Sequence, residues 1–358
     1  MAKFSEVLTI VNGRNQKQVV CDDGKYPIYG SGGIMGYAND YICKAETVVI
    51  GRKGSINKPI FVETPFWNVD TAFGLCANSE KLNPKYLYYF CEKFDFEKLN
   101  TTVTIPSLTK SNLLNVEIPL PNLEKQKQIV ELLDKITSLI SLRKQQLAKL
   151  DELVKAQFAN TFENDANFHT DYMENLSEFV TVGIANSATH AYAEHGVVML
   201  RNQNIKENHL DDTELVYIEP KFADKYKSKK LEANDILVTR TGYPGIACVV
   251  PQKYAGSQTF TTLIIRLKKE TSVSSCYICH YINSSHGKKY VSGTKVGVAQ
   301  QNFGAKVLAK MPVIIPPINL QNDFAAFVER VDQQKQTVQQ SLEKLELMKK
   351  ALMQEYFG

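Results

Sequence analysis

Glycine and proline are scarce in this chain: 19 and 13 among 358 residues exclude a collagen-like or low-complexity protein. No stretch approaches the ~20 uninterrupted apolar residues of a membrane span, and the first residues lack the apolar core of a signal peptide. The seven cysteines are odd in number and follow no framework spacing, so we expect reduced thiols. With 44% hydrophobic residues, the length suffices for about two folded domains. We expect a cytoplasmic protein without a membrane partner.

An excess of charge of one sign is also missing, since 42 lysines and arginines face 38 acidic residues for a net charge of +4. This mild basicity permits a nucleic-acid partner without requiring one. Catalytic motifs are missing too. The glycine-rich stretch 30–36 is not followed by the helix of a nucleotide-binding loop, and Cys276 and Cys279 lack the second ligand pair of a zinc site. We expect no catalytic residue, metal or cofactor in this chain.

What the sequence does contain is a long-range internal repeat. The segment 47–54, an apolar strand followed by Arg-x-Gly, returns 188 residues later as 235–242. The segment 115–123, which carries two prolines, returns as 310–320, at an offset of 195 at its start and 197 at its end. The same order and similar offsets indicate two copies of one architecture, with an insertion around 206–230 in the second copy.

Each copy ends in a long helical segment without interior glycine or proline, 123–163 and 318–358. Apolar residues recur there at alternating spacings of four and three, the seam of a coiled coil, interrupted by Arg143 and by Lys335. We expect the two helices to bury their seams on each other as an antiparallel coiled coil, although another subunit could cover the same pattern. The predicted seam residues are Ile129, Leu133, Ile136, Ile140, Leu147, Leu150 and Val154 in the first helix, and Val328, Val331, Val338, Leu342 and Leu345 in the second.

The remaining segments, 1–122 and 164–317, mix short β-rich runs with turn residues and a few helices. One helix start is explicit, because Asn83 can cap a helix whose first residue is Pro84. The predicted fold is therefore mixed α/β (α+β), with two globular domains that are each followed by a long helix and are related by an internal pseudo-two-fold repeat.

Polar loops occupy equivalent places in the two globular segments. Arginine reads guanine, asparagine and glutamine read adenine, and serine, threonine and lysine contact phosphates, so these loops contain the residue types of base-edge recognition. The candidate DNA-binding residues are Arg52, Lys53, Ser55, Asn57 and Lys58 in the first segment, and Arg201, Asn202, Gln203, Asn204, Arg240, Thr241, Tyr243, Gln300, Gln301 and Asn302 in the second.

The whole-chain layout resembles the specificity (S) subunit of type I restriction-modification systems. The resemblance rests on the tandem repeat, on the strands that end in Arg-x-Gly, and on the run 118–129, which is similar to the family's Ile-Pro-x-Pro-x-x-Glu-x-Gln-x-x-Ile start of a long helix. It implies a non-catalytic subunit with two target-recognition domains that each read half of a bipartite double-stranded DNA site. The helices would set the spacing and dock two methyltransferase (M) subunits. Restriction (R) subunits would join, and S-adenosylmethionine, ATP and Mg would act in those partner subunits.

The second copy departs from this pattern. The segment 317–323 lacks the Glu-x-Gln spacing, and the run that leads into its helix is two residues longer, so the register of the second helix stays open. Two further interpretations remain. One is a coiled-coil scaffold whose globular parts bind proteins. The other is a magnesium-dependent nuclease in which Asp212, Glu219 and Lys221 imitate an Asp…Glu-x-Lys metal site.

Overall fold

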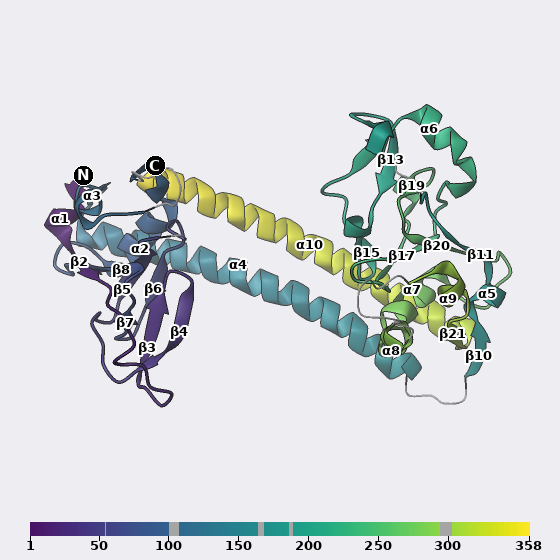
Figure 1. Cartoon of the computed structure of the whole chain (residues 1–358), viewed down its shortest axis with the longest axis horizontal. Helices are drawn as coiled ribbons and strands as arrows, with labels where there is room; N and C mark the ends of the chain where they lie inside the picture. Colours follow the sequence, from purple (N-terminus) through teal and green to yellow (C-terminus); the bar gives the residue numbers. More distant parts are fainter. Residues whose placement is uncertain (54, 100–106, 164–167, 186–188, 294–302) are drawn as a thin grey trace. The chain divides into compact units, whose positions relative to one another are not determined.

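The computed structural model describes residues 1–53, 55–99, 107–163, 168–185, 189–293 and 303–358 (Figure 1). They form two compact units: unit 1 contains Met1–Gln146 and Val338–Gly358, and unit 2 contains Leu147–Thr337. Both long helices, α4 (Leu123–Phe158) and α10 (Ile318–Phe357), therefore contribute one segment to each unit. The division into target-recognition domains at residues 1–122 and 164–317 stays a prediction.

The sheets of unit 1 are antiparallel apart from one strand pair. Four strands form one sheet in the order β2-β8-β5-β6, and three form a second in the order β4-β3-β7, where β3 and β7 run parallel. A short antiparallel pair joins β1 to β9. The elements are β1 (Ala2–Lys3), α1 (Phe4–Val7), β2 (Leu8–Asn12), β3 (Tyr26–Gly30), β4 (Gly33–Ala38), β5 (Thr47–Gly51), β6 (Ile60–Val62), β7 (Trp67–Asn68), β8 (Ala72–Ala77), α2 (Pro84–Lys93), η1 (Phe96–Leu99), α3 (Lys110–Leu114) and β9 (Glu117–Ile118).

The core of unit 1 combines β5, whose five residues are all buried, with α2 and one end of each long helix. Helix α2 begins as the sequence predicts. The Asn83 side chain accepts hydrogen bonds from the backbone N–H groups of Lys85 and Tyr86, and Pro84 is the first helical residue. Phe357, at the end of α10, packs on Tyr86 with ring centroids 4.9 Å apart. The end of α10 is thus part of this core.

Unit 2 repeats this topology. Its four-stranded sheet has the order β11-β20-β17-β18, and its second sheet has the order β12-β16-β13-β19, with β13 and β19 parallel as β3 and β7 are. Strand β10 pairs with β21 as β1 pairs with β9. The elements are β10 (His169–Tyr172), α5 (Met173–Leu176), β11 (Ser177–Val182), η3 (Thr189–Ala191), β12 (Tyr192–Ala193), β13 (Val197–Leu200), η4 (Asn202–Asn204), β14 (Ile205–Lys206), β15 (His209–Leu210), β16 (Val216–Ile218), α6 (Pro220–Lys225), η5 (Lys227–Lys229), β17 (Ile236–Val238), β18 (Ala247–Val249), η6 (Gln252–Tyr254), β19 (Gln258–Thr259), β20 (Leu263–Leu267), α7 (Ser275–Asn283), α8 (Ser285–Gly293), α9 (Ala305–Ala309) and β21 (Pro312–Ile315).

This shared topology confirms the internal repeat, and the extra residues of unit 2 fall on both sides of β16. Before β16, η4 and the hairpin β14–β15 replace the two-residue turn that joins β3 to β4 in unit 1. After β16, α6 and η5 lead to β17. The insertion expected around 206–230 therefore exists, but β16 divides it.

In unit 1 the two long helices run antiparallel. Leu133 lies in the same apolar cluster as Phe357. Farther along α4, Lys144 Nζ forms an ion pair of 2.9 Å with Oε1 of Glu346, which lies earlier in α10. Moving forward along α4 thus corresponds to moving backward along α10, which defines the antiparallel arrangement.

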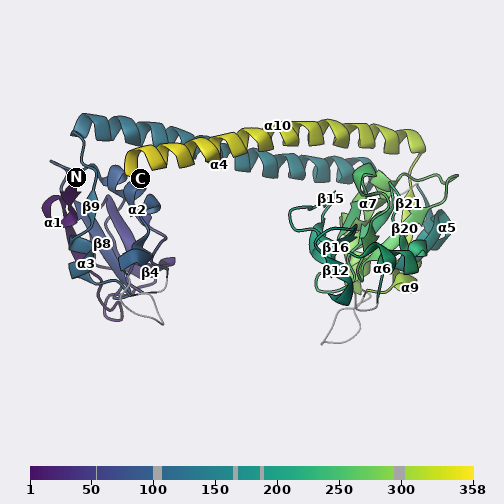
Figure 2. The same cartoon turned by 90° about the horizontal axis from the view of Figure 1, so that it is seen from above.

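The same arrangement holds in unit 2, where Figure 2 shows the helix pair along one side of the globular part. Phe158 packs edge-to-face on Phe324 at 5.4 Å. Lys335, the polar interruption of the second seam, places its Nζ 2.6 Å from Oδ1 of Asp151 on the facing helix, so its charge is neutralised across the seam. Eight predicted seam residues are buried (Ile129, Leu133, Ile136, Leu150, Val154, Val331, Val338 and Leu342), and four are half-buried (Ile140, Leu147, Val328 and Leu345).

A buried glutamine joins each long helix to the globular part of its unit. In unit 1, Gln126 Oε1 accepts a hydrogen bond from the Asn83 N–H at 2.8 Å. Its Nε2 donates to the carbonyl oxygens of Lys81 and Pro121 at 3.0 and 2.8 Å. One side chain thereby fixes the start of α4 to the start of α2.

Gln321 repeats these contacts in unit 2. Its Oε1 accepts from the Ser274 N–H at 2.9 Å, and its Nε2 donates to the carbonyl oxygens of Ser272 and Pro316 at 2.8 and 2.9 Å. Gln321 follows Gln126 by 195 residues, which is also the interval between the first residues of α4 and α10. The run that leads into the second helix was predicted to be two residues longer than the run before the first helix, and this prediction is wrong. Each helix has the same register relative to the globular part of its unit.

Candidate nucleic-acid interface

In unit 1 the loop after β5 is fixed by its backbone. The N–H of Arg52 donates to the Thr71 carbonyl at 2.8 Å, and the Arg52 carbonyl accepts from the Leu108 N–H at 3.0 Å. The Arg52 guanidinium lies 5.7 Å from the centre of the Phe73 ring. Because Arg52 is exposed, the loop presents a positioned cation to solvent.

The turn between β3 and β4 lies beside this loop. A Cβ atom at Gly51 would come within 3.0 Å of the Cβ of Ser31 and within 2.5 Å of the Ser55 carbonyl oxygen. A side chain at position 51 would therefore force the loop and the turn apart. Glycine allows them to share one end of unit 1.

The equivalent loop of unit 2 follows β17. The Phe303 N–H donates to the Arg240 carbonyl at 3.1 Å, as the Leu108 N–H donates to the Arg52 carbonyl in unit 1. In both units, therefore, a later segment of the chain closes on the arginine that follows a central strand. The repeat extends from the sheets to the loops.

The Arg240 loop is closed by a threonine at its base. Thr239 Oγ1 donates to the Tyr243 carbonyl at 2.7 Å and accepts from the Ile246 N–H at 2.9 Å. Gly242 has a φ of 75°, a conformation that glycine adopts without strain. This tight loop leaves Tyr243 85% exposed.

The loop after β13 joins the Arg240 loop in unit 2. Asn202 Nδ2 donates to Thr241 Oγ1 at 2.9 Å. The Arg201 guanidinium donates to the Glu214 carbonyl at 2.8 Å, and Gln203 Nε2 donates to Glu214 Oε2 at 3.3 Å. The structure thus brings the two predicted loops of unit 2 into one surface.

The predicted DNA-binding residues differ in accessibility. Arg52, Lys53, Ser55, Asn57, Lys58, Gln203, Thr241 and Tyr243 are exposed; Arg201, Asn202 and Arg240 are half-buried; Asn204 is buried. Gln300, Gln301 and Asn302 lie outside the described residues. Contact with DNA stays a prediction for this set.

Asn204 has a different role from the one that its chemistry predicts. It is 2% exposed, its Oδ1 accepts from the Arg201 N–H at 3.0 Å, and its Nδ2 donates to the carbonyl oxygens of Asp211 and Glu214 at 2.9 and 3.3 Å. The amide is fully used inside the loop. Asn204 therefore organises the loop and does not present its amide to a base.

Asn57 also holds its own unit together, although it is exposed. Its Nδ2 donates to Asp95 Oδ1 at 2.9 Å, and its Oδ1 accepts from the Phe96 N–H at 2.8 Å. The hydrogen bond from Asn57 is the main reason why the pKa of Asp95 lies below its ordinary value. The Asn57 side chain thus fixes the loop that contains Arg52 to Asp95 and Phe96.

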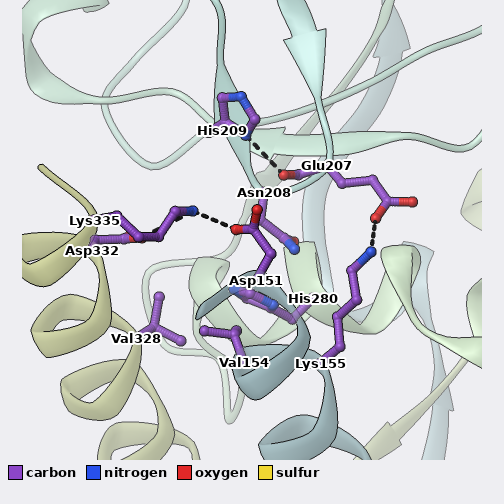
Figure 3. A pocket seen from close by; sticks show the side chains of 10 residues that line it. All are labelled: Asp151, Val154, Lys155, Glu207, Asn208, His209, His280, Val328, Asp332 and Lys335. Atoms are coloured by element: carbon purple, nitrogen blue, oxygen red, sulfur yellow. Dashed lines mark hydrogen bonds and ion pairs between the residues drawn. The ribbon is translucent and has the colours of Figure 1, made fainter. Parts of the chain in front are cut away.

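A cavity of about 160 Å³ in unit 2 is lined mostly by charged and polar side chains, together with Val154 and Val328 (Figure 3). Two of its ion pairs join Asp151 to Lys335 and Glu207 to Lys155, both at 2.6 Å. Burial, assisted by the charge of Lys335, lowers the pKa of His280 to about 4, so this ring is neutral. Across the described ranges of the chain, no group of His, Cys, Asp and Glu side chains could hold a metal ion. The Asp151–Lys335 ion pair joins α4 to α10, and the Glu207–Lys155 ion pair joins α4 to the globular part of unit 2.

The residues of the nuclease interpretation do not form a metal site. Asp212 Oδ2 accepts hydrogen bonds from Lys253 Nζ and from the Tyr254 hydroxyl, and the bond from Lys253 is the main cause of its lowered pKa. Glu219 directly precedes α6, whose first residue is Pro220. The Glu-Pro-Lys sequence is thus a helix start, where the nuclease motif would need a strand, and the nuclease interpretation is wrong.

A family model described as the type I restriction modification DNA specificity domain matches residues 1–152 and 170–347. The chain belongs to this family. The two matched regions agree with the internal repeat. The specificity subunit S.HindORF215P of Haemophilus influenzae is 23% identical over 347 residues, which cover 92% of this chain and 86% of the relative. The type I restriction enzyme MjaVIII specificity subunit of Methanocaldococcus jannaschii is 22% identical over 333 residues, with coverage of 86% and 75%.

Solved structures of the family have the same fold. The crystal structure of a type I S subunit from M. genitalium superposes with a TM-score of 0.63 at 14% identity and covers 100% of this chain and 95% of that one. A chain from a study of the assembly and conformational transition of the type I system gives 0.61 at 14% identity, with coverage of 99% and 96%. The predicted mixed α/β fold with its long helices is confirmed. This specificity subunit is a DNA-binding, non-catalytic component of a type I restriction enzyme.

In the described part of the chain, no helix is both long enough and apolar enough to cross a bilayer.

Proposed function

We propose that each unit of this specificity subunit reads one half of a bipartite double-stranded DNA site. The paired helices set the number of unread base pairs between the halves and dock two M subunits, and R subunits complete the enzyme. S-adenosylmethionine, ATP and Mg act in those partner subunits. One observation supports this most: Arg52 in unit 1 and Arg240 in unit 2 follow equivalent strands and are closed by equivalent backbone hydrogen bonds.

The chemistry of these loops suits base reading in the major groove. An arginine side chain can donate two hydrogen bonds to O6 and N7 of guanine, and lysine, serine and threonine contact phosphates. Unit 1 exposes the cations of Arg52, Lys53 and Lys58, whereas unit 2 exposes Thr241 and Tyr243. Because the two surfaces differ, the two half-sites should differ in sequence.

The experiment is to co-express this chain with its M subunit in a host without adenine methylation and to map modified adenines in the DNA by single-molecule sequencing. We expect a split motif with a fixed spacer. Exchange of residues 164–317 for those of another S subunit should change one half of the motif and leave the other half unchanged.

A matched control uses the same M subunit with a different S subunit. If that pair methylates DNA and the present chain leaves no motif, the DNA-reading proposal fails and the coiled-coil scaffold becomes the better interpretation.

A further inference from the structure

The hairpin of β3 and β4 in unit 1 exposes apolar side chains at its tip. Ile34 is 55% exposed and Met35 is 63% exposed. These two adjacent side chains form a contiguous exposed apolar patch, and such patches mark contact surfaces. Strand β4 is also the edge of its sheet, so its tip is accessible from the side.

A β-bulge explains how two consecutive residues can both be exposed. The strand pairing passes from Ile28 opposite Gly36 to Tyr29 opposite Ile34, so Met35 is an extra residue without a partner across the hairpin. In a regular strand, Ile34 and Met35 would point to opposite faces. A bulge changes the direction of a side chain and is typical of functional edges.

The bulged residue is held over the turn. A Cβ atom at Gly30 would lie 2.6 Å from Met35 Sδ, so the Met35 side chain crosses the backbone of Gly30. Glycine at position 30 makes this contact possible. The apolar tip is therefore a defined feature of the hairpin.

The tip is continuous with the candidate DNA surface of unit 1. Ser31, in the turn of this hairpin, lies against Gly51, and Gly51 is followed by the exposed cations Arg52 and Lys53. A surface that combines cations with an adjacent apolar tip is complementary to the major groove, where phosphates flank the C5-methyl groups of thymine.

Unit 2 has no such tip among its described residues. At the equivalent position β13 leads into η4, where Asn202 and Gln203 bond to Thr241 and Glu214. The two units therefore present different chemistry at the same place in the fold.

We propose that Ile34 and Met35 contact thymine methyl groups in the half-site that unit 1 reads. This inference rests on the proposed function and identifies specificity-determining residues for it. The contact explains why these side chains stay exposed in the free chain and why only unit 1 carries them among the described residues.

The test uses deoxyuridine, which pairs like thymine but lacks the methyl group. Once the motif is known, each thymine of the unit 1 half-site is replaced in turn, and binding of the complex with M subunits is measured. Loss of one buried methyl contact should weaken binding about fourfold. The double variant I34S/M35S should bind the thymine site more weakly and should no longer distinguish thymine from deoxyuridine.

Val20→Ser is the matched control, because Val20 is 53% exposed and pairs with Ala38 at the other end of β4. This variant should keep the full deoxyuridine effect. The inference is overturned if no thymine of that half-site matters, if the half-site contains no thymine, or if I34S/M35S keeps the effect. Loss of M-subunit assembly in I34S/M35S would also overturn it, because the tip would then be a protein contact. Failure of the proposed function is distinct, since the unmodified chain would then produce no methylation motif.

Discussion

Replacing Gln126 by leucine should destabilise unit 1 with little change in side-chain volume. The substitution removes three hydrogen bonds, one that the Gln126 side chain accepts and two that it donates. It leaves the Asn83 N–H and the carbonyl oxygens of Lys81 and Pro121 without this partner. Gln126 is 0% exposed, so water cannot replace these bonds without opening the core. At about 1 kcal/mol for each net hydrogen bond, the free energy of unfolding of unit 1 should fall by about 3 kcal/mol.

The chain contains its own reporter for unit 1. Trp67 is the only tryptophan in the sequence, lies in β7 and is 6% exposed. Its fluorescence during urea unfolding therefore follows unit 1 and is insensitive to unit 2. With a urea dependence of roughly 2 kcal/mol per M, the loss of about 3 kcal/mol should lower the midpoint by about 1.5 M.

Two control variants separate the hydrogen bonds from other effects. Gln128→Leu places the same side chain at an exposed position two residues along α4 and should leave the Trp67 midpoint within about 0.3 M, as surface substitutions do. Gln321→Leu removes the equivalent bonds in unit 2 and should shift the far-UV circular dichroism transition and not the Trp67 transition. Equal midpoints for Gln126→Leu and Gln128→Leu would refute the reasoning.

Arg240→Ala should reduce discrimination in the half-site read by unit 2 by about 1–3 kcal/mol with M-subunit assembly unchanged, which methylation mapping and gel filtration check; lost assembly with an unchanged motif would contradict it. The pKa of His280 is lowered to about 4 from the 6.5 of an accessible ring, so the unfolded chain binds a proton more tightly than the folded chain does. The free energy of unfolding should therefore fall by about 2 kcal/mol between pH 7.5 and 5. His280→Phe, which keeps the ring between Phe158 and Phe324, should flatten that dependence, and an unchanged slope by circular dichroism would disprove it. Inserting seven residues into both α4 and α10 should lengthen the unread spacer by about 3 base pairs, at ~1.5 Å per helical residue, and methylation mapping reads the spacer directly.

The long helices were predictable because their seam repeats in the sequence. Twelve apolar positions at heptad spacing all prove to be buried or half-buried, and the seam positions from Val328 to Leu345 follow those from Leu133 to Leu150 at an offset of 195 residues. The run that leads into the second helix is not two residues longer, and the sequence hides this for a definite reason. Asn319 stands where the first copy has Glu124, which hid the match between Gln126 and Gln321, and the bonds that identify these glutamines join segments 43 and 47 residues apart.

The loops were predictable in position but not in the role of each side chain. Arg52 and Asn57 lie in one loop and both have base-reading chemistry, yet Asn57 is occupied by Asp95, 38 residues away. A polar residue can read a base only if no other group of its own protein, backbone or side chain, has already taken its donors and acceptors. That condition depends on the tertiary fold, and no local pattern in the sequence expresses it.

Ile34 and Met35 escaped prediction for the opposite reason, since apolar residues in a strand are expected in the core. Their exposure depends on a bulge that the sequence marks only by a glycine-rich stretch.

The difference between residues that read DNA and residues that organise a loop matters when specificity is exchanged between S subunits. Transplanting Arg201 and Gln203 without Asn204, whose buried amide holds the loop, would transfer the polar groups without the hydrogen bonds that position them. We therefore expect exchange of a complete globular segment such as 164–317, with its organising residues included, to retain function better than exchange of single loop residues.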